Sequence, residues 1–382
     1  MKILPKKLEE KITTRIDENA LRRLDTPQGL VDFSSNDYLG FACSERIFNR
    51  AVTILEKNNF IQNGATGSRL LSGNSTLHEE AEKKIATFHQ ADSALIFNSG
   101  YDANLGFFSC VPQRGDMVFY DEFSHASIRD GIRLGMAKAF KFKHNDLEDL
   151  KSKIQHSLSK EPTEVYVVTE SVFSMDGDSP NLEAFAGFCK ENNFHLIVDE
   201  AHAIGVFGKK GEGLSQDKIF KNQVFARLVT FGKALGGHGA AILGSEDLRK
   251  YLINFARSFI YTTALPPHSL ATIQAAYEEL ENQSVSREKL RKNIAYFKAE
   301  IKKNNLEKPF IPSDSAIHSC QISGNKNVKR LSDNLRKKGF DLKPILSPTV
   351  PEGKERLRFC LHTYNSEEEI CRMFEALTTF VK

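Results

Sequence analysis

An aspartate and a lysine follow two apolar runs of the chain. Asp199 comes directly after Phe194–Val198, and Lys233 comes two residues after Phe225–Phe231. Short apolar runs of this kind are typical of buried strands. In open α/β sheets, ligands bind beyond the carboxyl ends of the strands. We therefore expect the Asp199 carboxylate and the Lys233 amine to face one ligand.

An acid and a lysine at such an edge suit pyridoxal phosphate. Its carbonyl needs a lysine for a Schiff base, and its ring nitrogen needs an acid to stay protonated. A nearby anion raises the pKa of the pyridine nitrogen, because an opposite charge favours the charged form. A lone aspartate more often caps a loop, and a lone lysine is more often solvated. The prediction therefore depends on the further motifs described below.

A rival interpretation comes from the run Asp199-Glu200-Ala201-His202, which spells the acidic box of nucleic-acid helicases. That box works together with a phosphate loop of the form GxxxxGK[ST]. The three Gly-Lys pairs of the chain are not followed by Ser or Thr; they begin at Gly208, Gly232 and Gly353. A nucleic-acid ATPase is therefore excluded.

Strand-like and helix-like segments alternate through the middle of the chain. Candidate strands lie near 94–97, 116–120, 139–143, 164–169, 194–198 and 225–231, and 240–243 adds a last strand. Such alternation predicts an α/β fold whose mostly parallel sheet carries helices on both faces. Polar clusters follow four of these strands, at 98–104, 121–127, 170–178 and 199–202. They all fall on one edge of the predicted sheet.

Two of these polar clusters, and two segments elsewhere in the chain, contain residues that suit a cofactor or a substrate. The turn at 98–104 has small residues whose free backbone N–H groups suit a phosphate, and Tyr101 adds a hydroxyl or a ring contact. His125 can stack on a pyridine ring or simply cap the next helix. The glycine-rich stretch 64–74 could approach a ligand closely, although most such loops are only turns. Arg358 alternates with Leu357 and Phe359 in a predicted strand, so it could hold a carboxylate in a bidentate manner or be solvated.

Length and composition are those of an ordinary soluble globular protein. The 382 residues are enough for one large domain and a smaller one. We predict an N-terminal helical segment at 1–30, a large domain at 31–270 and a small C-terminal α+β domain at 271–382. A net charge of +3 indicates neither a nucleic acid nor a membrane surface as partner. Six separated cysteines predict no metal site and no disulfide framework. Without a signal peptide or a membrane-spanning run, the chain is expected in the cytoplasm.

Six segments taken together resemble the α-oxoamine synthases, a family of pyridoxal-phosphate enzymes with the aspartate-aminotransferase fold, also called fold type I. The resemblance runs from about Arg22 to the C-terminus. Its segments are Asn36–Gly40, Thr66–Gly73, His125–Ser127, Val172–Gly177, Asp199–His202 and Thr230–Lys233. The resemblance implies a homodimer whose active sites lie at the subunit interface.

The resemblance also implies a role for individual residues. Lys233 would form the Schiff base, Asp199 would pair with the ring nitrogen, His202 would bond the phenolic oxygen, and His125 would stack on the ring and face the substrate. The remaining cofactor residues would be Gly100, Tyr101, Ser174, Thr230 and, from the dimer partner, Thr262. Arg358 would hold the amino-acid carboxylate, and Asn36, Thr349 and Arg22 would meet substrate.

Within the family, the glycine loop 67–74 and the turn Pro348–Pro351 look most like the member that condenses L-alanine with a pimeloyl thioester in biotin synthesis, releasing carbon dioxide. Other members use glycine or serine, and the thioester carrier, coenzyme A or a carrier protein, stays open. The chain departs from its relatives at Leu346-Ser347, where an arginine is common, at Glu200, where Asp is common, and at His238. An aminotransferase and a non-catalytic pyridoxal-phosphate protein are the rival interpretations.

Overall fold

The computed structural model describes residues 4–22, 24, 29–158, 164–216, 220, 223–282 and 284–381. The chain divides into two compact units. The large unit contains residues 36–174 and 178–289, and the small unit contains the described parts of 1–35 together with 175–177 and 290–382. Compact units are groups of contacting residues and not independently folding domains. The domain limits expected at 30 and 270 therefore stay a prediction.

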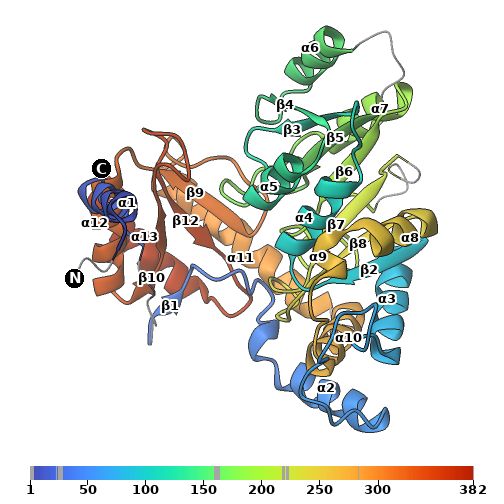
Figure 1. Ribbon diagram of the computed structural model, residues 1–382. Coiled ribbons are helices and arrows are strands. Elements are labelled where there is room, and N and C mark those ends of the chain that lie inside the picture. The colour runs from blue at the N-terminus through green and yellow to red at the C-terminus, as the bar shows by residue number, and fades with distance from the viewer. Residues whose placement is uncertain are drawn as a thin grey trace. The chain divides into compact units, whose positions relative to one another are not determined.

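A seven-stranded sheet forms the centre of the large unit (Figure 1). Its order is β2-β8-β7-β6-β5-β3-β4. Strand β8 runs antiparallel to β2 and β7, and the remaining pairs are parallel. The strands are β2 Ser93–Phe97, β3 Met117–Asp121, β4 Lys138–Phe142, β5 Val165–Glu170, β6 His195–Asp199, β7 Ala226–Thr230 and β8 Ala240–Gly244. The mostly parallel sheet predicted from the sequence is confirmed, with β8 as its one reversed strand.

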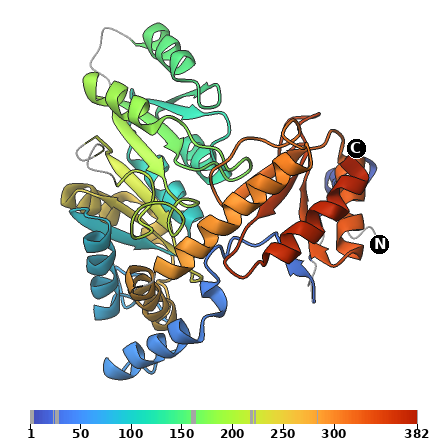
Figure 2. The same ribbon diagram turned by 180° about the vertical axis from the view of Figure 1, so that it is seen from behind.

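Alternate residues of each central strand enter two different apolar cores. In β6, Ile197 packs in the core formed with α4, α5 and α8, whereas Leu196 and Val198 pack in the core formed with α6 and α7. Figure 1 shows α4 and α5 on one face, and Figure 2, from behind, shows α7 on the other. Strands buried on both faces must be apolar at every position, which explains the continuous runs in the sequence.

The helices of the large unit connect the strands and cover the sheet. They are α2 Glu45–Lys57, α3 Thr76–Phe88, α4 Gly100–Cys110, α5 Ala126–Leu134, α6 Leu147–Ser157, α7 Leu182–Glu191, α8 Glu246–Phe255, α9 Arg257–Ile260 and α10 Pro267–Asn282, with a 3-10 turn at Phe41–Cys43. Helices α4, α5 and α6 each begin a few residues after a strand ends, and α7 follows β5 after the longer loop 171–181. These connections bring polar loops to the carboxyl edge of the sheet.

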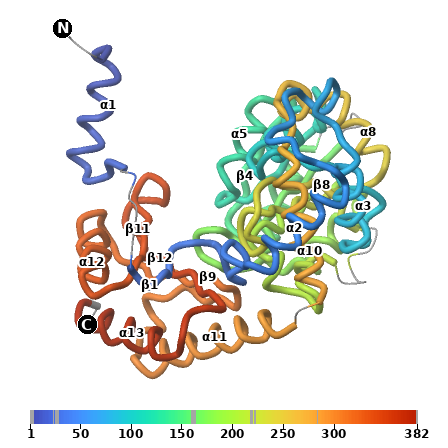
Figure 3. Tube along the Cα trace, turned by 90° about the horizontal axis from the view of Figure 1, so that it is seen from below, coloured from blue at the N-terminus to red at the C-terminus, as the bar shows by residue number. Residues whose placement is uncertain are grey.

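The small unit is built on a three-stranded antiparallel sheet of order β11-β12-β9. Its strands are β9 Ile317–Gln321, β11 Lys343–Ile345 and β12 Arg356–Cys360, and β1 Val31–Asp32 pairs separately with β10 Phe340–Asp341. Figure 3 traces β9, β11 and β12 with α12 Asn325–Lys337 and α13 Glu367–Val381 beside them. Helix α1 Lys6–Asp17 buries no side chain, and α11 Ser284–Lys303 begins in the large unit. Over the described ranges, no helix combines the length and apolar composition needed to cross a membrane.

Candidate active site

A cavity of about 220 Å³ lies at the carboxyl edge of the large sheet. Five strand ends contribute to it, because β2, β3, β5, β6 and β7 all lead into loops that reach this edge. Eight of the residues predicted around the cofactor line this one cavity: Gly100, Tyr101, His125, Ser174, Asp199, His202, Thr230 and Lys233. The expectation that polar strand ends meet at one edge is thus realised within a single compact unit.

A second, larger cavity of about 440 Å³ lies at the opposite end of β7, around Arg227, His89 and Ser245. None of the predicted site residues lines it. Arg227 already donates to the His89 carbonyl oxygen over 2.5 Å. Since function follows from convergent reactive groups and not from volume, the smaller cavity is the candidate active site.

Asp199 is the last residue of β6, and its carboxylate is held from two sides. Oδ1 accepts a hydrogen bond from the Ala201 N–H over 2.9 Å, and Oδ2 accepts one from Asn104 Nδ2 over 3.1 Å. The side chain is only 6% exposed. The same Asn104 amide also donates to Ser127 Oγ over 3.0 Å. Two donors on a buried carboxylate fix its direction towards the cavity.

A chain of hydrogen bonds leads from Lys233 to Asn36. Lys233 Nζ lies 2.8 Å from His202 Nε2, and His202 Nδ1 lies 2.7 Å from the Tyr38 hydroxyl. The Tyr38 hydroxyl donates to Asn36 Oδ1 over 3.1 Å. Because that hydroxyl has a single proton, it accepts from Nδ1–H, and Nε2 is left as an acceptor. Lys233 Nζ can therefore donate a hydrogen bond to His202 Nε2.

His125 is fixed by the residues around it. Its backbone N–H donates to Glu170 Oε1 over 2.6 Å, and its Nδ1 lies 2.7 Å from Ser127 Oγ. Burial lowers the pKa of His125, which favours the neutral imidazole. A neutral ring can stack on a pyridinium without repulsion between like charges.

Glu170 is a buried carboxyl group beside Asp199. The two residues face each other in the register of β5 and β6, and Glu170 is 3% exposed. Burial, and then the charge of Asp199, raise the pKa of Glu170 to about 8. Two adjacent carboxyl groups rarely ionise together, so Glu170 holds the proton and Asp199 the charge.

The first turn of α4 comes very close to β7. A Cβ atom on Gly100 would lie 2.8 Å from Thr230 Cγ2. Glycine is therefore required where the helix N-terminus meets the cavity. Ser99 Oγ already accepts from the Asp102 N–H, so the N–H groups of Gly100 and Tyr101 are the ones that would face a phosphate there. Tyr101 donates its hydroxyl hydrogen to Asp130 Oδ2 over 2.6 Å, which directs the phenol towards α5.

These residues fit pyridoxal phosphate. A lysine amine, a buried carboxylate, a neutral imidazole and a helix N-terminus line one cavity, and each matches one part of that cofactor. No role was predicted from the sequence for three supporting residues, namely Tyr38, Asn104 and Glu170. Glu170 could have been found as an acid at a strand end like Asp199. Tyr38 and Asn104 act through contacts with residues far away in the sequence, so the spacing of residues along the chain does not reveal their roles.

The other predicted site residues lie outside this cavity. Thr262 Oγ1 accepts a hydrogen bond from Asn98 Nδ2 over 3.0 Å in the large unit. Arg22, Thr349 and Arg358 belong to the small unit. There Arg22 Nη2 donates to Thr349 Oγ1 over 3.3 Å, although the two residues lie far apart in sequence. Arg358 is partly exposed between the fully buried Leu357 and Phe359, whereas Arg356 and Cys360, at the alternate positions of β12, are buried.

The arrangement of sheet, helices and lysine-containing cavity is that of the fold type I pyridoxal-phosphate enzymes. The chain belongs to the aminotransferase class I and II family, whose model matches residues 28–377. It is 40% identical to the 8-amino-7-oxononanoate synthase of Emericella nidulans, over 100% of this chain and 97% of that relative. The predicted fold class is confirmed.

Two solved structures extend the comparison. The 8-amino-7-oxononanoate synthase of Francisella tularensis is 32% identical, with a TM-score of 0.76, and the match covers 92% of this chain and 97% of that one. A serine palmitoyltransferase of S. paucimobilis, solved with bound PLP-myriocin aldimine, is 25% identical with a TM-score of 0.88 over 98% of this chain and 96% of that one. The predicted resemblance to the α-oxoamine synthases is confirmed.

Proposed function

We propose that this protein condenses L-alanine with a pimeloyl thioester, with loss of carbon dioxide, to give 8-amino-7-oxononanoate. The observation that carries this proposal is the single cavity in which Lys233, Asp199 and His125 meet. The names of relatives up to 40% identical support the choice of substrates. Pyridoxal phosphate is the proposed cofactor, and the cytoplasm is the proposed compartment.

When bound, pyridoxal phosphate supplies a protonated ring that withdraws electrons from the α-carbon of the amino acid. Asp199, whose carboxylate is held by Asn104 and the Ala201 N–H, would keep the ring nitrogen protonated. His125 would stack on the ring and exclude water from that face. His202, which lies at hydrogen-bond distance from Lys233 Nζ, would bond the phenolic oxygen of the cofactor.

Lys233 has two roles in this proposal. Its amine would hold the cofactor carbonyl, and as a free amine it would act as the general base that takes the proton from the substrate α-carbon. Its neighbour His202 lies at hydrogen-bond distance, which allows the proton to be passed on. The amine then lies where a proton must be returned to the product.

The predicted substrate residues belong to the proposal as well. Arg358 of the small unit would hold the alanine carboxylate, and Arg22 and Thr349 of the small unit and Asn36 of the large unit would contact substrate. The contact between Arg22 and Thr349 supports their common role, because it brings two predicted substrate residues together. Thr262 reaches the site of a second copy in a homodimer.

The charge of the C-terminal region supports an anionic thioester carrier. Residues 290–382 contain 18 Lys and Arg against 11 Asp and Glu, whereas the whole chain has 52 against 49. An excess of basic groups attracts an acidic partner and speeds its association. An acyl carrier protein and the phosphates of coenzyme A both meet this requirement. Rates measured with pimeloyl groups on each carrier, at low and high salt, distinguish the two.

The proposed function is tested by incubating the purified protein with pyridoxal phosphate, pimeloyl thioester and one amino acid at a time. We expect 8-amino-7-oxononanoate from alanine, identified by mass, together with released carbon dioxide. Product from serine with a long acyl thioester instead would make this a serine palmitoyltransferase. A keto acid formed without thioester would make it an aminotransferase.

A further inference from the structure

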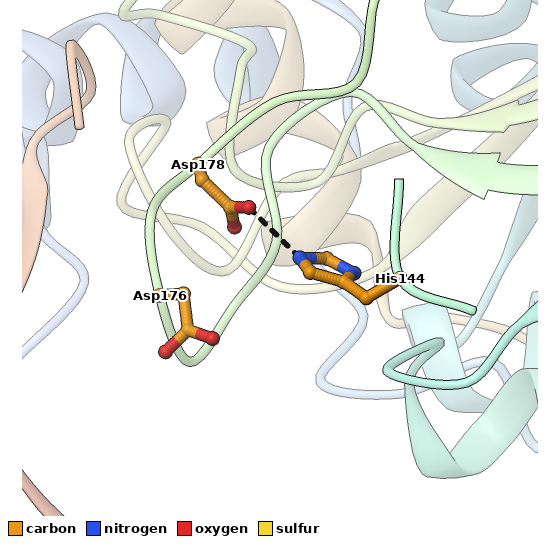
Figure 4. A group of neighbouring side chains, drawn as sticks. All are labelled: His144, Asp176 and Asp178. Carbon is orange, nitrogen blue, oxygen red and sulfur yellow. Dashed lines mark hydrogen bonds and ion pairs between the residues drawn. The ribbon is translucent and has the colours of Figure 1, made fainter. Parts of the chain in front are cut away.

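A histidine outside the cavity connects two of the loops that build it. His144 follows β4, and its Nδ1 lies 2.9 Å from Asp121 Oδ1 while its Nε2 lies 2.8 Å from Asp178 Oδ2. Figure 4 shows the hydrogen bond from His144 to Asp178, and it also draws Asp176 of the same loop. Ionised carboxylates can only accept hydrogen bonds, so both ring nitrogens must carry a proton to make both contacts. The geometry is that of an imidazolium ion between two carboxylates.

Both carboxylates are already committed as acceptors to other donors. Asp121 is fully buried, and its oxygens accept from the backbone N–H groups of Phe123 and Asn145, each over 2.8 Å. Asp178 Oδ2 also accepts from Asn145 Nδ2 over 2.8 Å. An oxygen that accepts several hydrogen bonds is stabilised in its ionised form. His144 must therefore supply the protons of both bonds.

The surroundings of the ring keep water away and hold it in place. The His144 ring lies 4.4 Å from the ring of Phe123 and 4.5 Å from that of Phe173, and its side chain is 18% exposed. Burial alone would lower the pKa of His144. The hydrogen bonds and charges of Asp121 and Asp178 outweigh burial and raise the pKa to about 9.

The other charged groups nearby do not compete for the imidazole protons. Glu122 Oε1 accepts from the backbone N–H of His144 over 3.1 Å. On α6, Asp149 accepts from the Lys143 N–H and forms an ion pair with Lys153. These acids add negative potential around His144. Asp149 is paired with Lys153, and Asp176 is paired with Arg356.

Each of the two carboxylates anchors a loop that delivers a residue to the cavity. Asp121 ends β3, and four residues later the chain reaches His125. Ser174 lies four residues before Asp178, and the Phe173 N–H donates to the Asp178 carbonyl oxygen over 2.9 Å, which closes that loop. His125 and Ser174 both line the cavity. His144 does not line it, so it acts through these loops.

We propose that His144 is a positioning residue, a protonated clamp that holds the His125 and Ser174 loops in the arrangement that binds the cofactor. The inference concerns the cofactor site of the proposed function and rests on it. His144 takes no part in bond making or breaking. Its contribution is to limit the motion of two loops that are separated in the chain by α5, β4, α6 and β5.

The protonation of His144 is tested directly by nitrogen NMR of the full-length protein with ¹⁵N-labelled histidine. We expect both ring nitrogens of His144 to show the shifts of an imidazolium at pH 8, and Asp178→Asn to remove that signature. A neutral His144 at pH 7 in the unaltered protein would overturn the proposal. Loss of cofactor affinity on chelator treatment would also overturn it, because a metal ion would then be holding the carboxylates.

The positioning role is tested with His144→Gln, which keeps one donor and removes the charge. We expect the dissociation constant for pyridoxal phosphate to rise about tenfold and the visible circular dichroism of the bound cofactor to weaken. Amide exchange at 121–125 and 173–178 should quicken in the cofactor-free protein. His156→Gln, at an exposed histidine of α6, is the matched control and should change none of these.

Two outcomes of this experiment are decisive. If His144→Gln lowered the melting temperature but left cofactor affinity and circular dichroism unchanged, the residue would be merely structural and the inference wrong. If His144→Gln failed to fold, Asp178→Asn, at a partly exposed side chain, would provide the same comparison. Failure of the proposed reaction would show as missing product with cofactor binding intact, which separates the two proposals.

Discussion

Glu170 and Asp199 place two carboxyl groups side by side on neighbouring parallel strands. Ionising one of two adjacent carboxyl groups costs less free energy than ionising both, and the proton stays on the more buried group. Glu170 therefore acts as a neutral acceptor for the His125 N–H, and Asp199 carries the charge that the cofactor ring requires. At the scale of residues, the site depends on which of two similar acids is ionised.

Replacing Glu170 by Gln tests this division. The folded pKa of Glu170 is about 8 against an ordinary value of 4.5, so the folded state holds a proton that the unfolded state releases between these values. Stability must fall as pH rises through this window, by about 1.4 kcal/mol for each unit by which the two pKa values differ. Glu170→Gln keeps the acceptor and should remove this loss. Urea unfolding of the cofactor-free protein at pH 5.5 and 7.5 measures the free energy of unfolding of the unaltered protein and of the variant. If that free energy changed equally between the two pH values in both proteins, the assignment would be contradicted.

Replacing Lys233 by Ala should lower turnover by on the order of 10³-fold or more, because both the Schiff-base partner and the general base are removed. Steady-state rates with alanine and pimeloyl thioester provide the measurement. Lys250→Ala, at an exposed lysine of α8, is the control and should be fully active. Substantial activity in Lys233→Ala would show that another residue carries the chemistry.

At the scale of elements, two close contacts decide how loops and helices meet the sheet. Gly100 lets α4 approach β7, and Glu200 ties the loop after β6 to a neighbouring segment. The Glu200 carboxylate is fully buried and accepts from Ser171 Oγ and the Ser215 N–H, each over 2.6 Å, and from the Leu214 N–H over 3.1 Å. The longer glutamate side chain spans the distance to 214–215, which explains why this chain has Glu200 at a position where Asp is common.

Shortening that side chain in Glu200→Asp should leave the two backbone donors at 214–215 unsatisfied. Each buried unsatisfied group costs about 1–3 kcal/mol, so the protein should lose stability of that order while Lys233 and Asp199 stay in place. Denaturant unfolding and kcat, measured on the same preparation, separate the two effects. A loss of kcat without loss of stability would mean that Glu200 acts on the chemistry and not on the loop.

Adding a methyl group in Gly100→Ala should weaken cofactor binding, because the new Cβ would lie 2.8 Å from Thr230 Cγ2. The overlap should cost about 1–3 kcal/mol. Thr230→Ser removes that methyl group and should restore binding in the double variant. Gly187→Ala in α7 is the matched control: nothing lies within 4 Å of its Cβ, and it should gain stability. Titration with pyridoxal phosphate measures the cofactor affinity of each variant. If Thr230→Ser did not restore binding in the double variant, the steric explanation would be rejected.

At the scale of the whole molecule, the proposed homodimer makes each site depend on two copies of the chain. If Thr262 serves the partner's site, an inactive Lys233→Ala protein and an inactive Thr262→Arg protein should complement each other. Mixed and refolded together, they form dimers with one intact site, and about a quarter of the wild-type activity should return. Sedimentation confirms that dimers have formed. No recovery in mixed dimers would place each site within one chain.

The sequence by itself determined the sheet and the edge at which chemistry occurs. Strand-length apolar runs and the polar residues that end them are local features, so Asp199 and Lys233 could be assigned to one edge whatever the order of the strands. The strand order, the reversal of β8 and the pairing of β5 with β6 were decided only by the tertiary structure. For that reason the proximity of Glu170 to Asp199 and the contacts of Asn104, Tyr38 and His144 were not visible in the sequence, since each depends on partners far away along the chain.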